Sequence, residues 1–548
     1  MKIHTRSFEN KPGLYYNRAM VNTIDSAKME TDRKLQRLPL DVQSFRKIVN
    51  DDFLYVDKTG FITKLINSKL TYFFLSRPRR FGKSLLVSTM KEVFSGKKEL
   101  FKNLEISHKI DWQTYPVIHF DFSLIAVDES IPVKKALADE VDKISRDYNL
   151  PTAEGNHKSK FRFLIENLSK KENKPVVILI DEYDQFIIRF ITDDELRETN
   201  RSELKDFFSV LKGSQDFLRF VFITGVSKFT RVSIFSDLNN LIDLTFDPDY
   251  SAIAGYTREE LLKYFSDYIH EFAEKENYPF DDLVELIRKW YNGYSWDGIT
   301  KIYNPFSILK FFSSYRFDDY WYCSGTPTFL IDMIRERKTK IHELDNIETT
   351  ISRIGNMDVG RITLTPLLFQ TGYLTIIKKI KKSIDKEEFI IGSPNKDVRI
   401  SFLTHLLEDF SGDNPRLIDN ITNAVKENRL DDMLADIKTI FAGVPYNNFD
   451  PGKEASYHAL IHVIFTLLLD NIGAEIQTIR GRLDQVIETD KYVYIFEFKM
   501  EDAQKALAQI HEKKYYERYK IKGKDIVLVG VSFSKEERNI KEWIIENL

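Results

Sequence analysis

The chain has 548 residues, of which 43% are hydrophobic and 30% are charged, and its formal net charge at pH 7 is −3. This length exceeds what one hydrophobic core can organise and indicates about three domains. The small net charge excludes a basic field over the whole molecule, so any surface for nucleic acid must be local. A single cysteine excludes an internal disulfide and a cysteine zinc cluster, and it favours a reducing, cytoplasmic compartment.

Residues 1–37 are polar and irregular, and we expect a flexible extension there, without the apolar run of a signal peptide. No later stretch reaches the ~18 uncharged apolar residues that a membrane span needs. From 38 to 250 the chain alternates short apolar strands with helices, which is typical of a parallel sheet. The predicted strands are Tyr72–Leu75, Val117–Phe122, Val176–Ile180 and Phe220–Thr224.

The rest of the chain is predicted to form three further regions. Residues 251–345 are helical and aromatic and would form a lid, with turns at Tyr291–Tyr294 and Tyr303–Phe306. Residues 346–445 form a mixed linking region, and residues 446–548 form the last domain.

A P-loop is predicted in the run Ser76-Arg77-Pro78-Arg79-Arg80-Phe81-Gly82-Lys83-Ser84, because a strand precedes it and a helix follows it. The loop amides and the helix N-terminus would hold the phosphates of ATP, Lys83 would reach the β- and γ-phosphates, and Ser84 would ligate Mg²⁺. Arg77 stands where the usual motif has its first glycine. Arg77, Arg79 and Arg80 would either bind phosphate or crowd it.

Two acids follow the third predicted strand. Asp181 suits Mg²⁺ held through water, and Glu182 suits polarisation of the attacking water. Asp184 would be a helper or a helix cap, and the alternative for the whole group is an ordinary helix N-terminus. Thr224 or Ser227, after a later strand, would sense the γ-phosphate or only form a turn.

A second site is predicted near the C-terminus, where Asp484 precedes an apolar strand that carries Glu497 and Lys499. The strand period of two puts Glu497 and Lys499 on the same side. Asp484 and Glu497 would hold Mg²⁺ with oxygen ligands, and Lys499 would orient or activate a water. This is the layout of metal-assisted phosphodiester hydrolysis. The alternative is a surface hairpin with ordinary salt bridges.

The second site resembles the PD-(D/E)XK nuclease superfamily, and the resemblance adds Glu454, at the start of a helix, and Gln509 on a later helix. From about 38 to 548 the chain resembles a bacterial family that joins an AAA-like ATPase domain to a C-terminal PD-(D/E)XK nuclease-like domain. That resemblance implies an α/β fold: a P-loop NTPase parallel sheet with a helical lid, and a restriction-endonuclease-like C-terminal domain. It also makes arginine the normal residue at the first P-loop glycine. The matching segments are Leu38–Phe45, Tyr55–Thr59, Ser76–Ser84, Asp181–Asp184, Ile223–Lys228, Tyr291–Tyr294, Phe369–Thr375, Ser393–Asn395 with Val398–Arg399, Gly481–Asp484 and Glu497–Lys499.

Two functions stay open at this level. One is a hydrolase that binds and hydrolyses ATP and carries a Mg²⁺-dependent nuclease acting on nucleic acid, with DNA as the expected substrate and a role in defence or mobile-element biology. The other is a non-catalytic nucleotide switch that binds nucleic acid or a protein partner. The complete set of carboxylates and lysine favours the first, because a binding-only fold has no reason to keep a costly charge cluster. The oligomeric state is left open, and a homo-oligomer is compatible with an AAA-like domain.

Overall fold

The computed structural model describes residues 35–128, 131–229, 234–235, 238–321, 346–358, 363–383, 385–411, 416–443, 457, 460–461, 464–468, 475–476, 485–500 and 502–548. Two predicted site residues, Glu454 and Asp484, lie outside this set, as does most of the predicted extension. Within the described ranges, no helix has both the length and the apolar character needed to cross a membrane.

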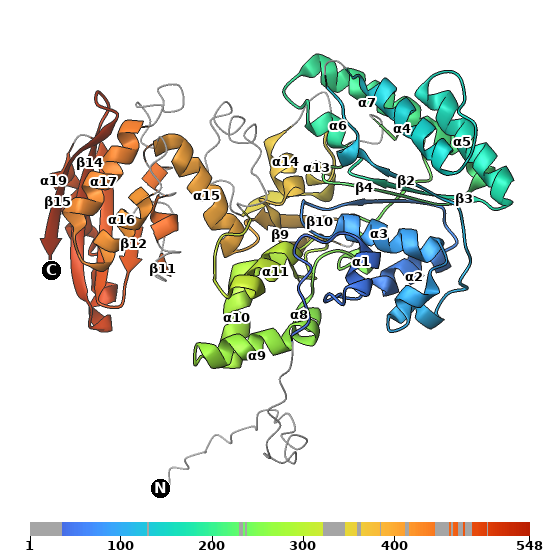
Figure 1. Ribbon diagram of the computed structural model, residues 1–548. Helices are drawn as coiled ribbons and strands as arrows, with labels where there is room; N and C mark the ends of the chain where they lie inside the picture. Colours follow the sequence, from blue (N-terminus) through green and yellow to red (C-terminus); the bar gives the residue numbers. More distant parts are fainter. Residues whose placement is uncertain are drawn as a thin grey trace, which may run out of the picture. The chain divides into compact units, whose positions relative to one another are not determined.

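The N-terminal half is built on a parallel sheet of five strands: β1 (Tyr72–Ser76), β2 (Val117–Asp121), β3 (Val176–Asp181), β4 (Leu218–Gly225) and β5 (Ile242–Asp243). Its helices are α1 (Phe45–Asn50), α2 (Thr59–Asn67), α3 (Lys83–Phe94), α4 (Val133–Asp147), α5 (His157–Glu172), α6 (Gln185–Ile188) and α7 (Asp194–Gly213). The strand order is β2-β3-β4-β1-β5. Helices α4, α5 and α7 cover one face and α3 the other (Figure 1).

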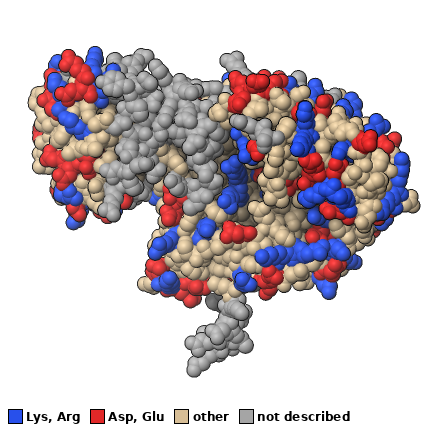
Figure 2. Space-filling view, turned by 45° about the horizontal axis from the view of Figure 1, so that its top comes forward, with Lys and Arg blue, Asp and Glu red and all other residues tan. Residues whose placement is uncertain are grey.

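The predicted α/β fold with a parallel sheet is confirmed, and its cause is visible in β3. All six residues of this strand are buried, because helices cover both faces of the sheet. The short strand β5, which pairs with β1, was not predicted, since two residues carry no recognisable period. Acidic and basic side chains are interspersed over the visible surface, in agreement with the small net charge (Figure 2).

The middle of the chain combines helices with two small antiparallel sheets. Its helices are α8 (Arg258–Tyr264), α9 (Ser266–Lys275), α10 (Phe280–Tyr291), α11 (Pro305–Ser314), α13 (Ile351–Ile354) and α14 (Leu364–Thr371). Its strands are β6 (Asn292–Tyr294), β7 (Ile302–Tyr303), β8 (Ile347–Thr349), β9 (Thr375–Lys381) and β10 (Glu387–Gly392). The two predicted turn motifs lie where α10 passes into β6 and where β7 passes into α11, and β6 pairs with β7.

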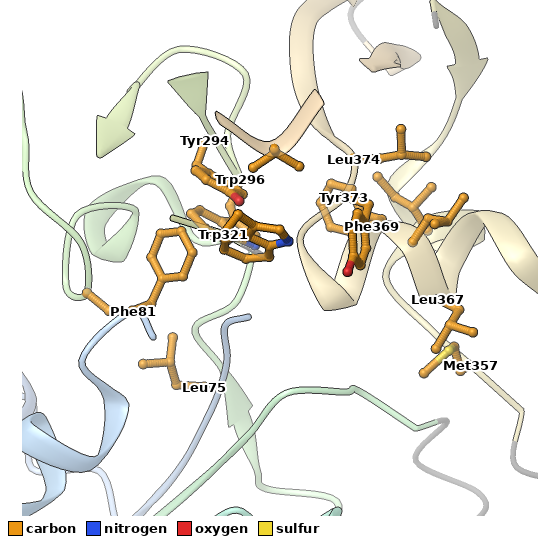
Figure 3. Packing of buried hydrophobic residues seen from close by; sticks show 14 of the residues in the cluster. Leu75, Phe81, Tyr294, Trp296, Trp321, Met357, Leu367, Phe369, Tyr373 and Leu374 are labelled. Atoms are coloured by element: carbon orange, nitrogen blue, oxygen red, sulfur yellow. The ribbon is translucent and has the colours of Figure 1, made fainter. Parts of the chain in front are cut away.

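An aromatic cluster joins the loop after β1 to this middle region. The ring of Phe81 meets those of Tyr294 and Trp296 edge to face, at centroid distances of 4.8 and 5.4 Å. Figure 3 shows Phe81, Tyr294, Trp296 and Trp321 gathered at one place. The Tyr294 hydroxyl also donates to the Gly372 carbonyl at 3.0 Å. The loop after β1 is therefore packed against residues distant in sequence.

The C-terminal region contains a mixed five-stranded sheet: β11 (Glu475–Ile476), β12 (Gln485–Glu488), β13 (Tyr492–Met500), β14 (Asp525–Ser534) and β15 (Asn539–Asn547). Its helices are α15 (Lys396–Ser411), α16 (Arg416–Lys426), α17 (Leu430–Gly443) and α19 (Ala503–Lys513). Strands β13 and β14 run parallel, and the other neighbours run antiparallel.

The two faces of β13 pack against different partners. Phe496 and Phe498 contact the Phe465 ring on one face. Val493 and Ile495 form a cluster with Leu507 and Ile510 of α19 on the other face. Because side chains alternate along a strand, Glu497 belongs to the α19 face.

Candidate functional site

The loop between β1 and α3 presents a lysine to a surface cavity. Gly82 caps the 12-residue helix α3 at φ 88°, a left-handed conformation that glycine adopts without strain. The next side chain, Lys83, is only 3% exposed. Its Nζ donates to the Pro78 carbonyl at 3.2 Å and lies 3.4 Å from Glu182 Oε1. A buried ammonium group at a helix N-terminus is suited to bind phosphate.

The cavity in front of Lys83 has a volume of about 490 Å³ and a lining of mixed character. The polar and basic groups of the lining suit phosphates, and its apolar groups suit a flat base. The predicted residues in the lining are Arg79, Arg80, Gly82, Lys83, Ser84 and Glu182. Apolar residues in the lining include Leu40, Val42, Leu54, Val56, Ile253, Phe306 and Leu309.

The two predicted acids lie at the end of β3, but they have different surroundings. Asp181 is buried, its carboxylate accepts a hydrogen bond from the Glu182 backbone N–H, and the Ser84 side chain acts to lower its pKa. Burial, reinforced by the charge of Glu182, raises the pKa of Asp181 to about 6. Glu182 lines the cavity and has φ 51°, an unusual value for a residue with a side chain. Such strained backbone is common at functional sites.

The Asp184 carboxylate links the segment that follows β3 to the segment that follows β4. Its carboxylate accepts the backbone N–H groups of Val226 and Ser227, at 3.2 and 2.6 Å. It forms no side-chain cap on α6, so the predicted helix-cap role is wrong. The reason is that these two amides, which follow β4, already occupy both of its oxygens.

Arg77, at the position of the usual first glycine, lies away from the cavity. Its side chain is fully buried, and its guanidinium donates to the carbonyls of Ser76 and Thr245, each at 2.9 Å. The guanidinium carbon also lies 4.1 Å from the centre of the Trp296 ring. Burial lowers the pKa of Arg77 to about 9, so the group stays charged at neutral pH. Neither predicted role, binding or crowding phosphate, fits this orientation.

We expect Arg77→Gly, which restores the usual motif, to lower the free energy of unfolding by about 2–4 kcal/mol. The variant loses a desolvated cation–π contact and leaves buried carbonyls without donors. Urea unfolding followed by circular dichroism measures the effect. The control is Arg79→Gly, which introduces a glycine in place of arginine elsewhere in the same loop. Equal stability of the two variants would contradict the structural role of Arg77.

Thr224 and three further residues complete the description of this site. Thr224 lies at the end of β4, where its carbonyl accepts the Tyr183 N–H; its side chain is buried and outside the cavity lining. Lys58, Ser123 and Gln185 also line the cavity, although no role was predicted for them. Lys58 Nζ contacts both carboxylate oxygens of Glu260 at 2.6 Å. Its place in the Tyr55–Thr59 segment was the signal that could have indicated it.

The C-terminal cluster is built on β13 and α19. Glu497 is 3% exposed, and its Oε1 accepts a hydrogen bond from Gln509 Nε2. Lys499 Nζ lies 3.0 Å from the same oxygen. Glu497 Oε2 is buried and has no hydrogen-bond partner among the described residues. Lys499 and Gln509 therefore share one carboxylate oxygen and leave the other free to bind a ligand.

The free oxygen fits the predicted metal site. A buried carboxylate oxygen without a partner is unfavourable, and a hard cation such as Mg²⁺ satisfies it. Gln485, the first residue of β12, is paired with Phe496. In the sequence, Asp484 directly precedes Gln485, and Glu497 directly follows Phe496. Asp484 and Glu454 lie outside the described residues, so their roles stay predictions.

Comparisons with known proteins agree with this division into two sites. Residues 39–235 match a family described as "Predicted AAA-ATPase", and residues 452–543 match one described as "PD-(D/E)XK nuclease superfamily". A protein of Azotobacter chroococcum mcd 1, described as "Uncharacterized protein in vnfD 5'region", is 33% identical over 526 residues. This similarity covers 94% of the present chain and 99% of that protein. The chain belongs to the family of proteins in which an AAA-ATPase-like domain precedes a C-terminal domain of the PD-(D/E)XK nuclease superfamily.

Proposed function

We propose that this protein is an ATP-dependent nuclease, with a C-terminal site that hydrolyses phosphodiester bonds of DNA. The observation that carries the proposal is the buried, unpartnered Oε2 of Glu497, with Lys499 on the same carboxylate. An ordinary salt bridge would not leave a buried oxygen without a partner. The arrangement therefore supports a site that takes up a cation and a phosphate.

The groups of the C-terminal site have separate tasks. Glu497 and the predicted Asp484 would hold Mg²⁺, which when bound supplies positive charge to the phosphodiester. Gln509 donates to Glu497 Oε1 and fixes the orientation of the carboxylate. Lys499, whose side chain is about one-third exposed, has access to solvent and would orient the attacking water. Glu454 is proposed to orient the same water or the metal.

The groups of the N-terminal site suit ATP. Lys83 would bind the β- and γ-phosphates, with Arg79 and Arg80 adding charge at the lining of the cavity. Ser84 and Asp181 would hold Mg²⁺, which when bound neutralises phosphate charge. Glu182, held near Lys83, would orient the attacking water. Thr224 stays a candidate sensor of the γ-phosphate.

Nucleotide binding would influence the middle of the chain through the cavity itself. The lining combines P-loop residues with Phe306 and Leu309 of α11. The Arg80 guanidinium carbon lies 4.5 Å from the centre of the Phe306 ring. Phosphate that draws the Arg80 side chain away from Phe306 would weaken this contact. We propose that ATP changes the packing of the helices that follow β5 by replacing the Arg80–Phe306 contact with an Arg80–phosphate contact.

Incubation of the purified protein with supercoiled plasmid, Mg²⁺ or Mn²⁺, with and without ATP, tests the proposal. We expect nicked and linear products that require the metal. Absence of cleavage of plasmid and of single-stranded DNA or RNA under all these conditions would leave the alternative function, a nucleotide switch that binds nucleic acid or a protein partner.

Lys83→Ala is expected to weaken ATP binding about ten- to a hundredfold, since it removes a charge-assisted phosphate contact worth on the order of 1.5–3 kcal/mol. Isothermal titration calorimetry with ATP and Mg²⁺ measures the loss. Lys91→Ala, an exposed lysine on the same helix α3, is the matched control and should bind as the wild type does. ATP binding by Lys83→Ala at wild-type affinity would reject the P-loop assignment.

A further inference from the structure

A second cleft lies in the middle of the chain, separate from the residues that line the ATP cavity. It has a volume of about 610 Å³ and is formed by α8, the end of α10, the β6–β7 hairpin and β9. Its lining contains four basic residues, Arg258, Arg288, Lys289 and Lys301, and one acidic residue, Glu259. In a chain whose formal net charge is −3, this is a local concentration of positive charge.

The basic groups are held in place from within the protein. Glu285 contacts Arg258 at 2.5 Å and Arg288 at 2.6 Å, so one carboxylate fixes two guanidinium groups. Both arginine side chains stay nearly half exposed and can bind a second anion. Because one carboxylate serves two guanidinium groups, the set keeps an excess of positive charge.

Lys301 is the most constrained of the four. Its Nζ donates to the carbonyls of Ile376 and Ile377 at 2.7 and 3.2 Å, which ties the hairpin to β9. Among the described residues no carboxylate lies within ion-pair distance of this ammonium group. Burial lowers the pKa of Lys301 to about 8, with the charge of Asp297 acting in the opposite direction. A half-buried cation whose hydrogen bonds go only to carbonyls is further stabilised when another anion arrives.

Two sequence motifs with no task at either proposed site meet at the cleft. Asn292 and Gly293 of the first motif and Pro394 of the second are all in the lining. Gly293 has φ 135°, and a Cβ built on it would lie 1.9 Å from the Pro394 carbonyl oxygen. The close approach therefore requires glycine. The two motifs together form the part of the cleft lining that lies beside the basic residues.

Apolar groups complete the cleft. Ile299, at the tip of the hairpin, is 73% exposed, and Ile377 of β9 is 38% exposed. Both are part of the lining. A strand of nucleic acid offers phosphates to basic groups and flat base or sugar surfaces to apolar ones. An inorganic anion would use the charges, but it would leave these apolar side chains in water.

We propose that the cleft formed by Arg258, Arg288, Lys289, Lys301 and Ile299 binds the sugar–phosphate backbone of a nucleic acid strand. The choice of nucleic acid, rather than another polyanion, rests on the proposed function, because the same chain carries the nuclease superfamily domain. Binding at this cleft would hold substrate through a surface other than the cleavage site.

The test uses the full chain with Arg288→Ala and Lys289→Ala together, because both side chains lie on the exposed last turn of α10. Lys134→Ala with Lys135→Ala removes the same charge from an exposed pair on α4 and is the control. Fluorescence anisotropy with fluorescein-labelled single-stranded DNA and RNA oligonucleotides, in EDTA to prevent cleavage, gives the affinity over a range of salt concentrations. We expect roughly tenfold weaker binding by the α10 variant and a salt dependence reduced by about 1.4 in log–log slope, since two phosphate contacts are lost.

The outcomes separate this inference from the proposed function. Equal affinity and equal salt slope of the α10 and α4 variants would overturn the cleft assignment, even if plasmid cleavage is found. Weaker binding together with a smaller salt slope, in the α10 variant alone, would support it even if no cleavage occurs. A loss of affinity that does not change the salt slope would also overturn it, because it would not come from phosphate contacts. Thermal unfolding of both variants shows that their folds are intact.

Discussion

Glu497→Ala is expected to reduce Mg²⁺-dependent plasmid cleavage by about a thousandfold or more. Glu497, Lys499, Gln509 and the bound metal would act as a unit, so the loss of one costs nearly as much as the loss of all. The substitution removes the free Oε2 and also the oxygen that Lys499 and Gln509 share. The nicking assay on supercoiled plasmid, with initial rates over several enzyme concentrations, gives the factor.

Two further variants identify the reason for this loss. Glu512→Ala removes an exposed carboxylate from the same helix as Gln509 and should cut at the wild-type rate. Lys499→Ala removes no metal ligand, so it should still bind Mg²⁺ and yet cut poorly. ATP binding should be unchanged in all three, since none of these residues lies in the lining of the ATP cavity. Wild-type cleavage by Glu497→Ala would show that the activity belongs to another site or to a contaminant.

The strands that carry the two sites were predictable because they are buried on both faces. Such strands, β3 and β13, appear as continuous apolar runs that end in or contain a charged residue. The alternation along β13 also predicted that Glu497 and Lys499 share a side, and their contact at 3.0 Å confirms it. Local rules sufficed here, because the residues concerned are close in the sequence.

The orientation of Arg77 was not predictable, because its partners are remote in the sequence. Its guanidinium contacts the Thr245 carbonyl and the Trp296 ring. Both residues belong to segments that no local pattern connects with the P-loop. The basic cleft was not predictable from the sequence for the same reason, because Arg258, Arg288 and Lys301 come from three separate elements. Composition averages these charges over the whole chain, whereas the fold concentrates them.

Glu182→Gln is expected to bind ATP with wild-type affinity and to hydrolyse it about 10²–10⁴ times more slowly. Glutamine keeps the shape of the side chain, so the unusual backbone at φ 51° need not change. It loses the negative charge that would orient the attacking water and accept its proton. Its proximity to Lys83, at 3.4 Å, places this carboxylate within the phosphate-binding part of the cavity. Phosphate release under saturating ATP and Mg²⁺, together with ATP binding by calorimetry, separates turnover from affinity.

The control for this prediction is Glu195→Gln, the same chemical change on the exposed surface of α7, which should hydrolyse ATP as the wild type does. Wild-type turnover by Glu182→Gln would remove Glu182 from the reaction. Asp184 is not a ready substitute, because both of its oxygens already accept backbone N–H groups. If the wild type binds ATP through Lys83 but releases no phosphate, the carboxylate is not used for hydrolysis. ATP would then act as a bound effector, and the nuclease would respond to nucleotide occupancy alone.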